Sequence, residues 1–153
     1  MFSHAPPGYE CPFCRIVRGI EDEHVLSRRS DVVYHDDTLT AFIGSGQWPR
    51  NQGHVLIVSN AHFENVFDLP ESFGEPIQRL TRRIALAMKA EYGCTGVSTR
   101  QHNEPDGGQD VWHYHVHVFP RYRGDGLYAS SREPMSIDQR AGFAARLKAR
   151  LQV

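Results

Sequence analysis

Three of the nine histidines occupy alternate positions within one short stretch, Trp112 to Pro120. The residues between and after them are aromatic or β-branched, which is the pattern of a strand with two unlike faces. Side chains at alternate positions of a strand point to the same face, so His113, His115 and His117 are expected to share one exposed face. The residues expected on the other face, toward the core, are Tyr114, Val116 and Val118.

This histidine face predicts a functional site. A single buried histidine is usually satisfied by a carboxylate or a water, but three in strict alternation are poorly explained in that way. Two chemistries fit them. One is zinc coordination, which His-x-His on a strand suits. The other is nucleophilic catalysis by an imidazole whose second nitrogen is held by another group. His54, just after Gly53, is a further candidate for a phosphate-binding or acid–base group.

Cys11 and Cys14 have the spacing of one half of a zinc site. A redox pair is the alternative, but a thioredoxin-like motif follows a strand within a βαβ pattern, and this pair precedes the first predicted strand. The spacing therefore favours zinc, with His62 and His113 as the natural remaining ligands. The three cysteines are an odd number. This count indicates a reducing compartment, so the cytoplasm is the expected location.

Length and charge exclude several classes of protein. The 153 residues fit one domain, and the net charge of -1 gives no electrostatic case for binding nucleic acid or an anionic membrane. The apolar runs are short, so no membrane-spanning segment is expected, and the first ten residues lack the features of a signal peptide. Residues 1–10 are expected to be flexible, and residues 11–153 to form a single domain.

The periodicity of apolar residues predicts an α+β domain. A long helix is expected to begin near Glu75 and to stop at Gly93. A capping box formed by Ser136 and Gln139 opens a C-terminal helix over 137–151. Strands outnumber helices and come in adjacent pairs, which favours an antiparallel sheet of about five strands with the long helix on one face. Besides the histidine stretch, the expected strands are 32–35, 39–43, 54–58 and 97–101, and 44–53 is expected to be a loop.

A polar, Gly-rich loop, 103–109, leads into the histidine stretch. Glycine lets backbone N–H groups approach an anion closely, although a plain tight loop is an equally good interpretation. Gln109 lies four residues before His113, which is close enough to reach a substrate bound on the strand.

Five segments of the chain together point to one known family. They are Cys11-Pro12-Phe13-Cys14-Arg15-Ile16, Gly53-His54-Val55-Leu56-Ile57-Val58, Gly107-Gly108-Gln109, His113-Tyr114-His115-Val116-His117-Val118-Phe119 and Pro120-Arg121-Tyr122. These segments resemble the histidine triad (HIT) family, in particular its bacterial zinc-containing members, over roughly residues 11–125. The resemblance implies a HIT-like α+β fold, with an antiparallel five-stranded sheet, one long helix and short helices. It also implies a homodimer that forms a continuous sheet.

The resemblance further implies a nucleotide hydrolase or nucleotidyl transferase. Its substrate would be a nucleoside phosphoramidate or a dinucleoside polyphosphate with an AMP or GMP moiety. His115 would attack the α-phosphate and form a nucleotidyl-histidine intermediate. His117 and His54 would contact the phosphate, and Gln109 would position the phosphate or the leaving group.

The family also implies how zinc is held. In its zinc-containing members the cysteine pair, a histidine after the central strand and the first triad histidine bind the metal. These positions correspond to Cys11, Cys14, His62 and His113. The expected cofactor is one structural Zn²⁺ per chain, closed by four protein ligands.

The chain departs from the family pattern at three positions. One is the Asn that usually precedes Gly-Gly-Gln, which is matched by type at Asn103 but by count at His102. An Asp or Asn that usually holds the ribose is replaced, by the common spacing, by Gly46, and Ser45 or Gln47 is expected to substitute. Asp110 follows Gln109 where a Ser or Thr often assists the leaving group, so leaving-group preference is expected to differ. The expected substrate-binding residues are Asn103, Gly108, Phe42 and Ser45, and the side chains considered for flanking the base are Phe13, Ile16, Phe42 and Ile43.

Three alternative functions stay open at the level of the sequence. The first is a metallohydrolase in which all three triad histidines bind zinc. The second is a nucleotide-binding protein with little turnover, which the missing ribose acid supports. The third is redox use of Cys11 and Cys14.

Overall fold

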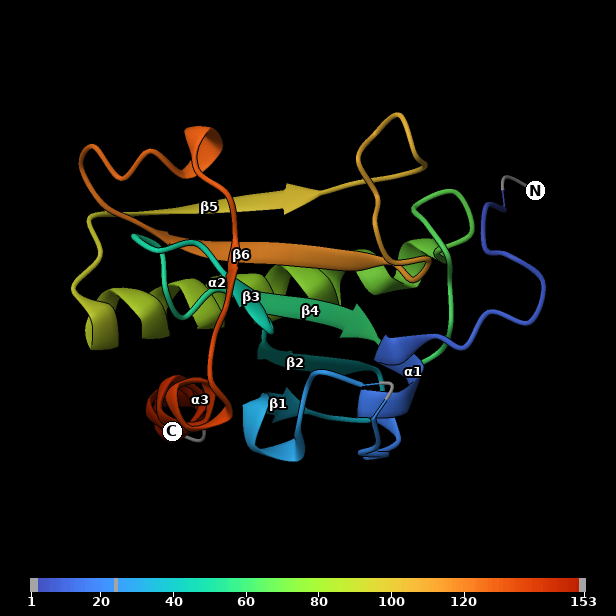
Figure 1. Ribbon diagram of the computed structural model, residues 1–153, viewed down its shortest axis with the longest axis horizontal. Coiled ribbons are helices and arrows are strands. Elements are labelled where there is room, and N and C mark those ends of the chain that lie inside the picture. The colour runs from blue at the N-terminus through green and yellow to red at the C-terminus, as the bar shows by residue number, and fades with distance from the viewer. Residues whose placement is uncertain (1–2, 24, 152–153) are drawn as a thin grey trace.

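The computed structural model describes residues 3–23 and 25–151, so the ends of the two expected segments, residues 1–2 and 152–153, lie outside the described residues. The described part of the chain forms a five-stranded antiparallel sheet with helices packed against it (Figure 1). The sheet order is β1-β2-β4-β6-β5, which confirms the expected α+β fold. The strands are β1 (Val32–His35), β2 (Leu39–Ile43), β4 (Val55–Ser59), β5 (Gly96–Gln101) and β6 (His115–Arg121).

The central strand β4 contributes side chains to two apolar clusters, one on each face of the sheet. All five of its residues are buried, as expected for a strand covered on both faces. Val55 and Ile57 pack into the large apolar cluster that includes α2 (Gly74–Tyr92) and α3 (Ile137–Leu151). Leu56 and Val58 pack into a smaller cluster with α1 (Pro12–Val17). The sheet therefore carries α2 and α3 on one face and α1 on the other.

Both long helices begin where their sequences predict, and α2 also ends at the predicted glycine. In α2 the buried residues recur at helical spacing, and Gly93 ends the helix in the left-handed conformation with φ 62°. The predicted capping box is confirmed at α3, where Ser136 Oγ accepts from Gln139 N and Gln139 Oε1 accepts from Ser136 N. In Figure 1, α2 runs behind the sheet and α3 is seen end-on beside β1. The short 3₁₀ helices are η1 (Arg29–Asp31), η2 (Glu71–Phe73) and η3 (Leu127–Ala129).

A buried ion pair attaches α3 to the chain before β1. Arg140 Nε donates to both carboxylate oxygens of Asp31 at 3.1 Å, and the exposed fractions of the two residues are 4% and 0%. The other guanidinium nitrogens of Arg140 donate to the carbonyl oxygens of Met135 and Leu26. The Arg140 side chain thus pairs with a buried charge and joins the start of α3 to residues 26–31, which are distant in sequence.

The histidine stretch differs from the expectation in two ways. β6 begins only at His115, and His113 lies in the bend before it, where its N–H donates to Val111 O. The histidine face is buried, because α1 and neighbouring loops cover it: the exposed fractions of His113, His115 and His117 are 0%, 1% and 5%. As predicted, the opposite face of the stretch enters the large core cluster, with Tyr114, Val116 and Val118.

The expected loop at 44–53 contains a strand that pairs with a distant part of the chain. β3 (Gly46–Gln47) pairs antiparallel with β7 (Glu133–Pro134), in a second, two-stranded sheet. Residues 130–135, here called the strap, pass from η3 to α3 in front of β6 (Figure 1). The two-residue strand was not predicted, because so short a segment has no periodicity to detect.

Two further observations concern the periphery. In the N-terminal segment expected to be flexible, residues 3–10 contact the domain: Ser3 Oγ and His4 N donate to the Glu64 carboxylate, each at 2.6 Å. The imidazole of His4 also stacks on Trp112, with ring centroids 5.7 Å apart. Among residues 3–23 and 25–151, every helix is too short or too polar to cross a bilayer.

Candidate functional site

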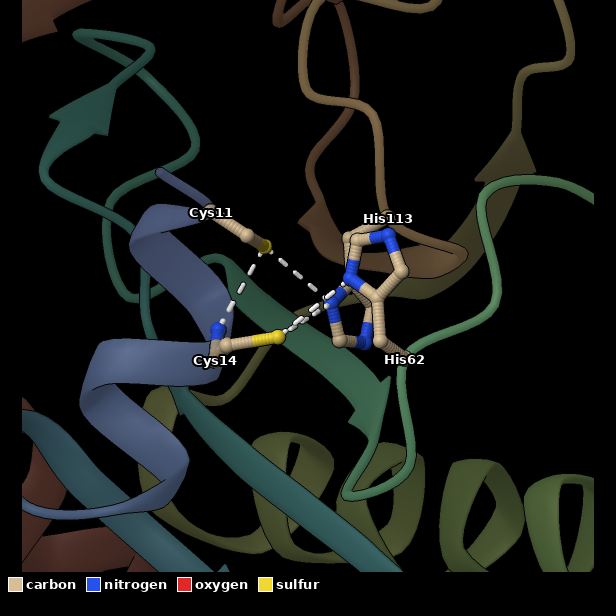
Figure 2. Close-up of side chains that lie close together, drawn as sticks. All are labelled: Cys11, Cys14, His62 and His113. Atoms are coloured by element: carbon tan, nitrogen blue, oxygen red, sulfur yellow. Dashed lines mark hydrogen bonds between the residues drawn. The ribbon is translucent and has the colours of Figure 1, made fainter. Parts of the chain in front are cut away.

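Two cysteines and two histidines converge at the start of α1 (Figure 2). The sulfurs of Cys11 and Cys14 face the imidazoles of His62 and His113, and the four donor atoms lie within 4.8 Å of one another. His113 Nδ1 is 3.2 Å from Cys11 Sγ and 3.6 Å from Cys14 Sγ, and His62 Nδ1 is 3.3 Å from Cys14 Sγ. The four residues proposed as zinc ligands from the sequence are therefore brought together.

The cluster fits a tetrahedral zinc ion. With ordinary Zn–S and Zn–N bond lengths, the S···N edge of a tetrahedron is about 3.6 Å, close to the separations found. His113 Nε2 donates to the Ser59 carbonyl oxygen at 2.8 Å, so the unprotonated Nδ1 presents its lone pair to the sulfurs. Hydrogen bonding from Cys11, with the two nearby imidazoles, holds the pKa of the Cys14 thiol well below its usual range. The donors are thus set for a metal with four protein ligands.

The middle histidine is held in one orientation by the backbone. His115 Nδ1 donates to the carbonyl oxygen of His113 at 2.7 Å, because a carbonyl can only accept. The other ring nitrogen, Nε2, therefore carries a free lone pair. Burial lowers the pKa of His115, so its imidazole is neutral at pH 7. Phe13 packs edge-on against the ring, with centroids 5.2 Å apart.

The third histidine is held by His54. His54 Nε2 lies 2.9 Å from His117 Nδ1, and the two rings stack with centroids 5.1 Å apart. Gln47 Nε2 lies 3.5 Å from His54 Nδ1, and Gln47 Oε1 accepts from His54 N at 2.9 Å. When His54 carries its proton on Nε2, it donates to His117 Nδ1, and its Nδ1 accepts from Gln47 Nε2. The proton of His117 then lies on Nε2. Burial lowers the pKa of His54 to about 3, so this pair is uncharged at neutral pH.

A cavity of about 490 Å³ lies over these histidines. Its lining includes His54, His115 and His117, with Leu56 beside them. A second cavity of similar volume lies elsewhere, and its described lining contains arginines and aromatic residues but no histidine or cysteine. The histidine cavity is therefore the candidate active site. Its remaining walls come from α1 (Pro12, Phe13), residues 25–27, residues 44–46, Asp110, Val111 and the strap (Arg132, Glu133, Pro134).

Of the four residues expected to bind substrate, Ser45 lines the cavity. Phe42 is fully buried beneath Phe13, at a ring-centroid distance of 5.5 Å, so Phe13 takes the cavity position. Asn103 Oδ1 accepts from Val66 N at 2.8 Å, and its amide also bonds to Gln101. Gly108, at φ 82°, bonds through its carbonyl to His102. Asn103 and Gly108 therefore shape the loop before β6.

Gln109 also holds this loop. Its Oε1 accepts from Glu104 N at 2.9 Å, and its Nε2 donates to the carbonyl oxygens of Glu64 and Val111. Both ends of the carboxamide are bonded to backbone groups, and Gln109 is not among the described residues that line the cavity. The next residue, Asp110, faces the cavity, with Oδ1 3.9 Å from His115 Nε2.

Sequence analysis did not find the contribution of the strap. Arg132 lines the cavity and pairs with Asp110, with Nη2 2.7 Å from Oδ2. Its sequence neighbourhood is a short polar run without periodicity. The one signal was indirect: Gly46, which has no side chain, stands where a larger residue is usual.

Comparison with known proteins agrees with this geometry. Residues 25–124 match the model of the HIT domain. The chain is 33% identical over 120 residues to Protein hit of Bacillus subtilis, which covers 78% of this chain and 77% of that protein. It is 27% identical over 135 residues to adenylylsulfatase HINT3 of Arabidopsis thaliana, which covers 86% of this chain and 64% of that protein.

A solved structure extends the agreement to the fold. The zinc-bound histidine triad family protein of Mycobacterium smegmatis is similar with a TM-score of 0.75 and 26% identity, over 93% of each chain. The domain match covers most of the chain, and it contains His54, His62 and the three triad histidines. This chain belongs to the histidine triad (HIT) family.

Proposed function

We propose that this protein is a nucleotide hydrolase or nucleotidyl transferase that reacts at the α-phosphate of its substrate through a nucleotidyl-histidine intermediate on His115. One observation carries the proposal: the bond from His115 Nδ1 to His113 O leaves Nε2 free beside Asp110, in the cavity. A buried, neutral imidazole with one nitrogen fixed as a donor is suited to nucleophilic attack by the other.

The reaction proceeds in two displacements. His115 Nε2 forms a bond to the α-phosphorus as the bond to the leaving group breaks, and the electron pair departs with that group. Water, which gives up a proton to solvent, or another acceptor then forms a bond to phosphorus as the N–P bond breaks, and its electron pair restores the neutral imidazole. His117 Nε2–H donates to a phosphate oxygen in both steps, while His54 and Gln47 fix the His117 tautomer. His54 thus acts as a positioning residue behind His117.

Zinc, when bound by Cys11, Cys14, His62 and His113, has a structural role in this proposal. The four protein donors would complete a tetrahedral shell, which would leave no position for water or substrate. The cluster ties α1 to the bend before β6. It therefore fixes Phe13 against the His115 ring and the His113 carbonyl to which His115 donates.

The proposed substrate is a nucleoside phosphoramidate or a dinucleoside polyphosphate with an AMP or GMP moiety. The cavity volume of about 490 Å³ is within the range of small-molecule sites. The similarity to a protein named adenylylsulfatase supports an adenylyl donor. Phe13 and Leu56 offer apolar surface for a base, and Ser45 is the proposed ribose contact.

The proposed assembly is a homodimer with a continuous sheet. β5 is at one edge of the sheet and pairs with β6 alone among the described strands. Its outer N–H and C=O groups are available to a second copy of the strand. The three free cysteines favour a reducing compartment, so the cytoplasm is the proposed location.

Product analysis tests the proposed function. Wild-type protein and His115→Ala are incubated with adenosine phosphoramidate and with diadenosine polyphosphates, and AMP is quantified. Wild type is expected to release AMP, and His115→Ala to lose this activity by about 10³-fold or more. Activity that is lost on chelation but kept in Cys14→Ser would favour a metallohydrolase with zinc on the three triad histidines. Tight AMP binding without turnover of any substrate would favour a binding protein.

A further inference from the structure

An ion pair links the proposed nucleophile to the strap. Arg132 Nη2 donates to Asp110 Oδ2 at 2.7 Å, and Asp110 Oδ1 lies 3.9 Å from His115 Nε2. Both charged side chains line the cavity and are about half exposed, at 54% for Arg132 and 44% for Asp110. The Arg132 guanidinium is thus connected through Asp110 to His115 Nε2, the atom that would attack phosphorus.

The strap is fixed without help from this ion pair. Gly46 pairs with Pro134, Met135 N donates to Ser45 O at 3.1 Å, and Trp48 Nε1 donates to Ser130 O at 3.1 Å. The Arg132 side chain can therefore move while its backbone stays in place.

Gly46 leaves room for this side chain. A Cβ atom at position 46 would lie 3.0 Å from Arg132 Cδ and 3.4 Å from Cγ, which is closer than side chains normally pack. The aliphatic part of Arg132 therefore crosses the glycine backbone on its way to the cavity. The path of the Arg132 side chain therefore depends on glycine at position 46.

Arg132 neutralises the negative charge of Asp110 beside the proposed nucleophile. Without a counter-charge, the Asp110 carboxylate beside His115 would repel an incoming phosphate and any anion that leaves it. A half-exposed ion pair contributes little to stability, so an anionic ligand can displace the carboxylate at small cost. The planar guanidinium matches the oxygens of phosphate or sulfate and can donate two hydrogen bonds to them.

We propose that Arg132 binds the leaving group and makes this enzyme selective for nucleotides whose leaving group is an anion, such as a sulfate or a phosphate chain. This inference rests on the proposed function and names the substrate class. With adenylyl sulfate, the His115–phosphorus bond forms as the phosphorus–oxygen bond breaks, and the electron pair leaves with sulfate, beside Arg132. With a phosphoramidate, the nitrogen takes a proton from solvent and leaves as uncharged ammonia, for which Arg132 offers no attraction.

Two substrates with the same AMP group isolate the charge of the leaving group. The measured quantity is kcat/KM for adenylyl sulfate divided by kcat/KM for adenosine phosphoramidate. Arg132→Ala is expected to lower this ratio about 10- to 100-fold, the loss of one or more charge-assisted hydrogen bonds. Arg132→Lys, which keeps the charge and guards against a folding defect, is expected to be intermediate. Arg82→Ala, on an exposed position of α2, removes a charge from the opposite face and is the matched control.

Asp110→Asn separates direct contact from simple neutralisation. If Arg132 contacts the leaving group, Arg132→Ala lowers the ratio also in the D110N background. Equal ratios in D110N and in the double variant, or an unchanged ratio in Arg132→Ala alone, would overturn the inference. Wild-type protein that cleaves both substrates, with a ratio insensitive to Arg132, would refute only this inference. Wild-type protein that cleaves neither of these substrates nor a diadenosine polyphosphate would refute the proposed function itself.

Discussion

His115 Nδ1 donates to the backbone carbonyl of His113, 2.7 Å away, while the side chain of His113 belongs to the cysteine–histidine cluster. His113 thus supplies a candidate metal ligand and a backbone acceptor, whereas His115 presents a free ring nitrogen. The cluster and the candidate nucleophile are coupled through a single residue, so the metal site is expected to influence activity by geometry.

The first prediction concerns zinc content. Purified wild-type protein is expected to carry about one zinc per chain by elemental analysis, and Cys14→Ser to lose it. Loss of the metal is expected to lower the free energy of unfolding by at least about 4 kcal/mol. Cys94→Ser is the control for zinc content, because Cys94 is buried in the core cluster away from the ligands. Full zinc content in Cys14→Ser would contradict the assignment.

The second prediction concerns the buried ion pair. Asp31→Ala is expected to cost about 3–5 kcal/mol in urea unfolding, because it leaves the Arg140 charge buried without its carboxylate. Asp31→Leu combined with Arg140→Met is expected to recover much of that loss, since no uncompensated charge remains. Strictly additive effects of the two positions would show that the pair is not coupled.

The third prediction is a pH dependence of stability that arises from His54. Burial, and then the charge of Arg100, lower its pKa to about 3, below the ordinary value near 6.5. The folded protein therefore binds fewer protons than the unfolded chain, so stability rises with pH and is lost as the pH falls below 6.5. His54 is expected to remove about 1.4 kcal/mol between pH 7.5 and 5.5.

The measurement is urea unfolding of zinc-loaded wild type and His54→Asn at the two pH values. Contributions from the zinc ligands are common to both proteins and cancel in the difference. Equal losses of stability in wild type and His54→Asn over this range would show that His54 does not titrate as proposed.

Much of the fold followed from local patterns. The continuous apolar run from Val55 to Val58 identified the central strand, and Gly93 and the Ser136 capping box identified helix ends. These signals are local in sequence, since a glycine stop or a cap depends on a few residues. The four metal-binding candidates also followed, because Cys-x-x-Cys has the spacing of one half of a zinc site and two histidines could complete it.

The details of the cavity did not follow from the sequence. Whether a glutamine faces a ligand or the backbone depends on which partners the fold brings near, and Gln109 finds three backbone groups. The approach of Arg132 depends on pairing between segments more than 80 positions apart, as Gly46 and Pro134 are. Phe42 and Phe13 have equal apolar character, so only tertiary packing decides which one reaches the cavity.

The most direct test of the account is to trap the nucleotidyl enzyme. Wild-type protein is mixed with an adenylyl donor, quenched rapidly in base, where a phosphorus–nitrogen bond to histidine persists, and mapped by peptide mass spectrometry. The account predicts one adenylyl group on His115, formed as fast as turnover and absent from His115→Ala. Turnover in His115→Ala at the wild-type rate, or an adenylyl group on a different residue, would contradict it.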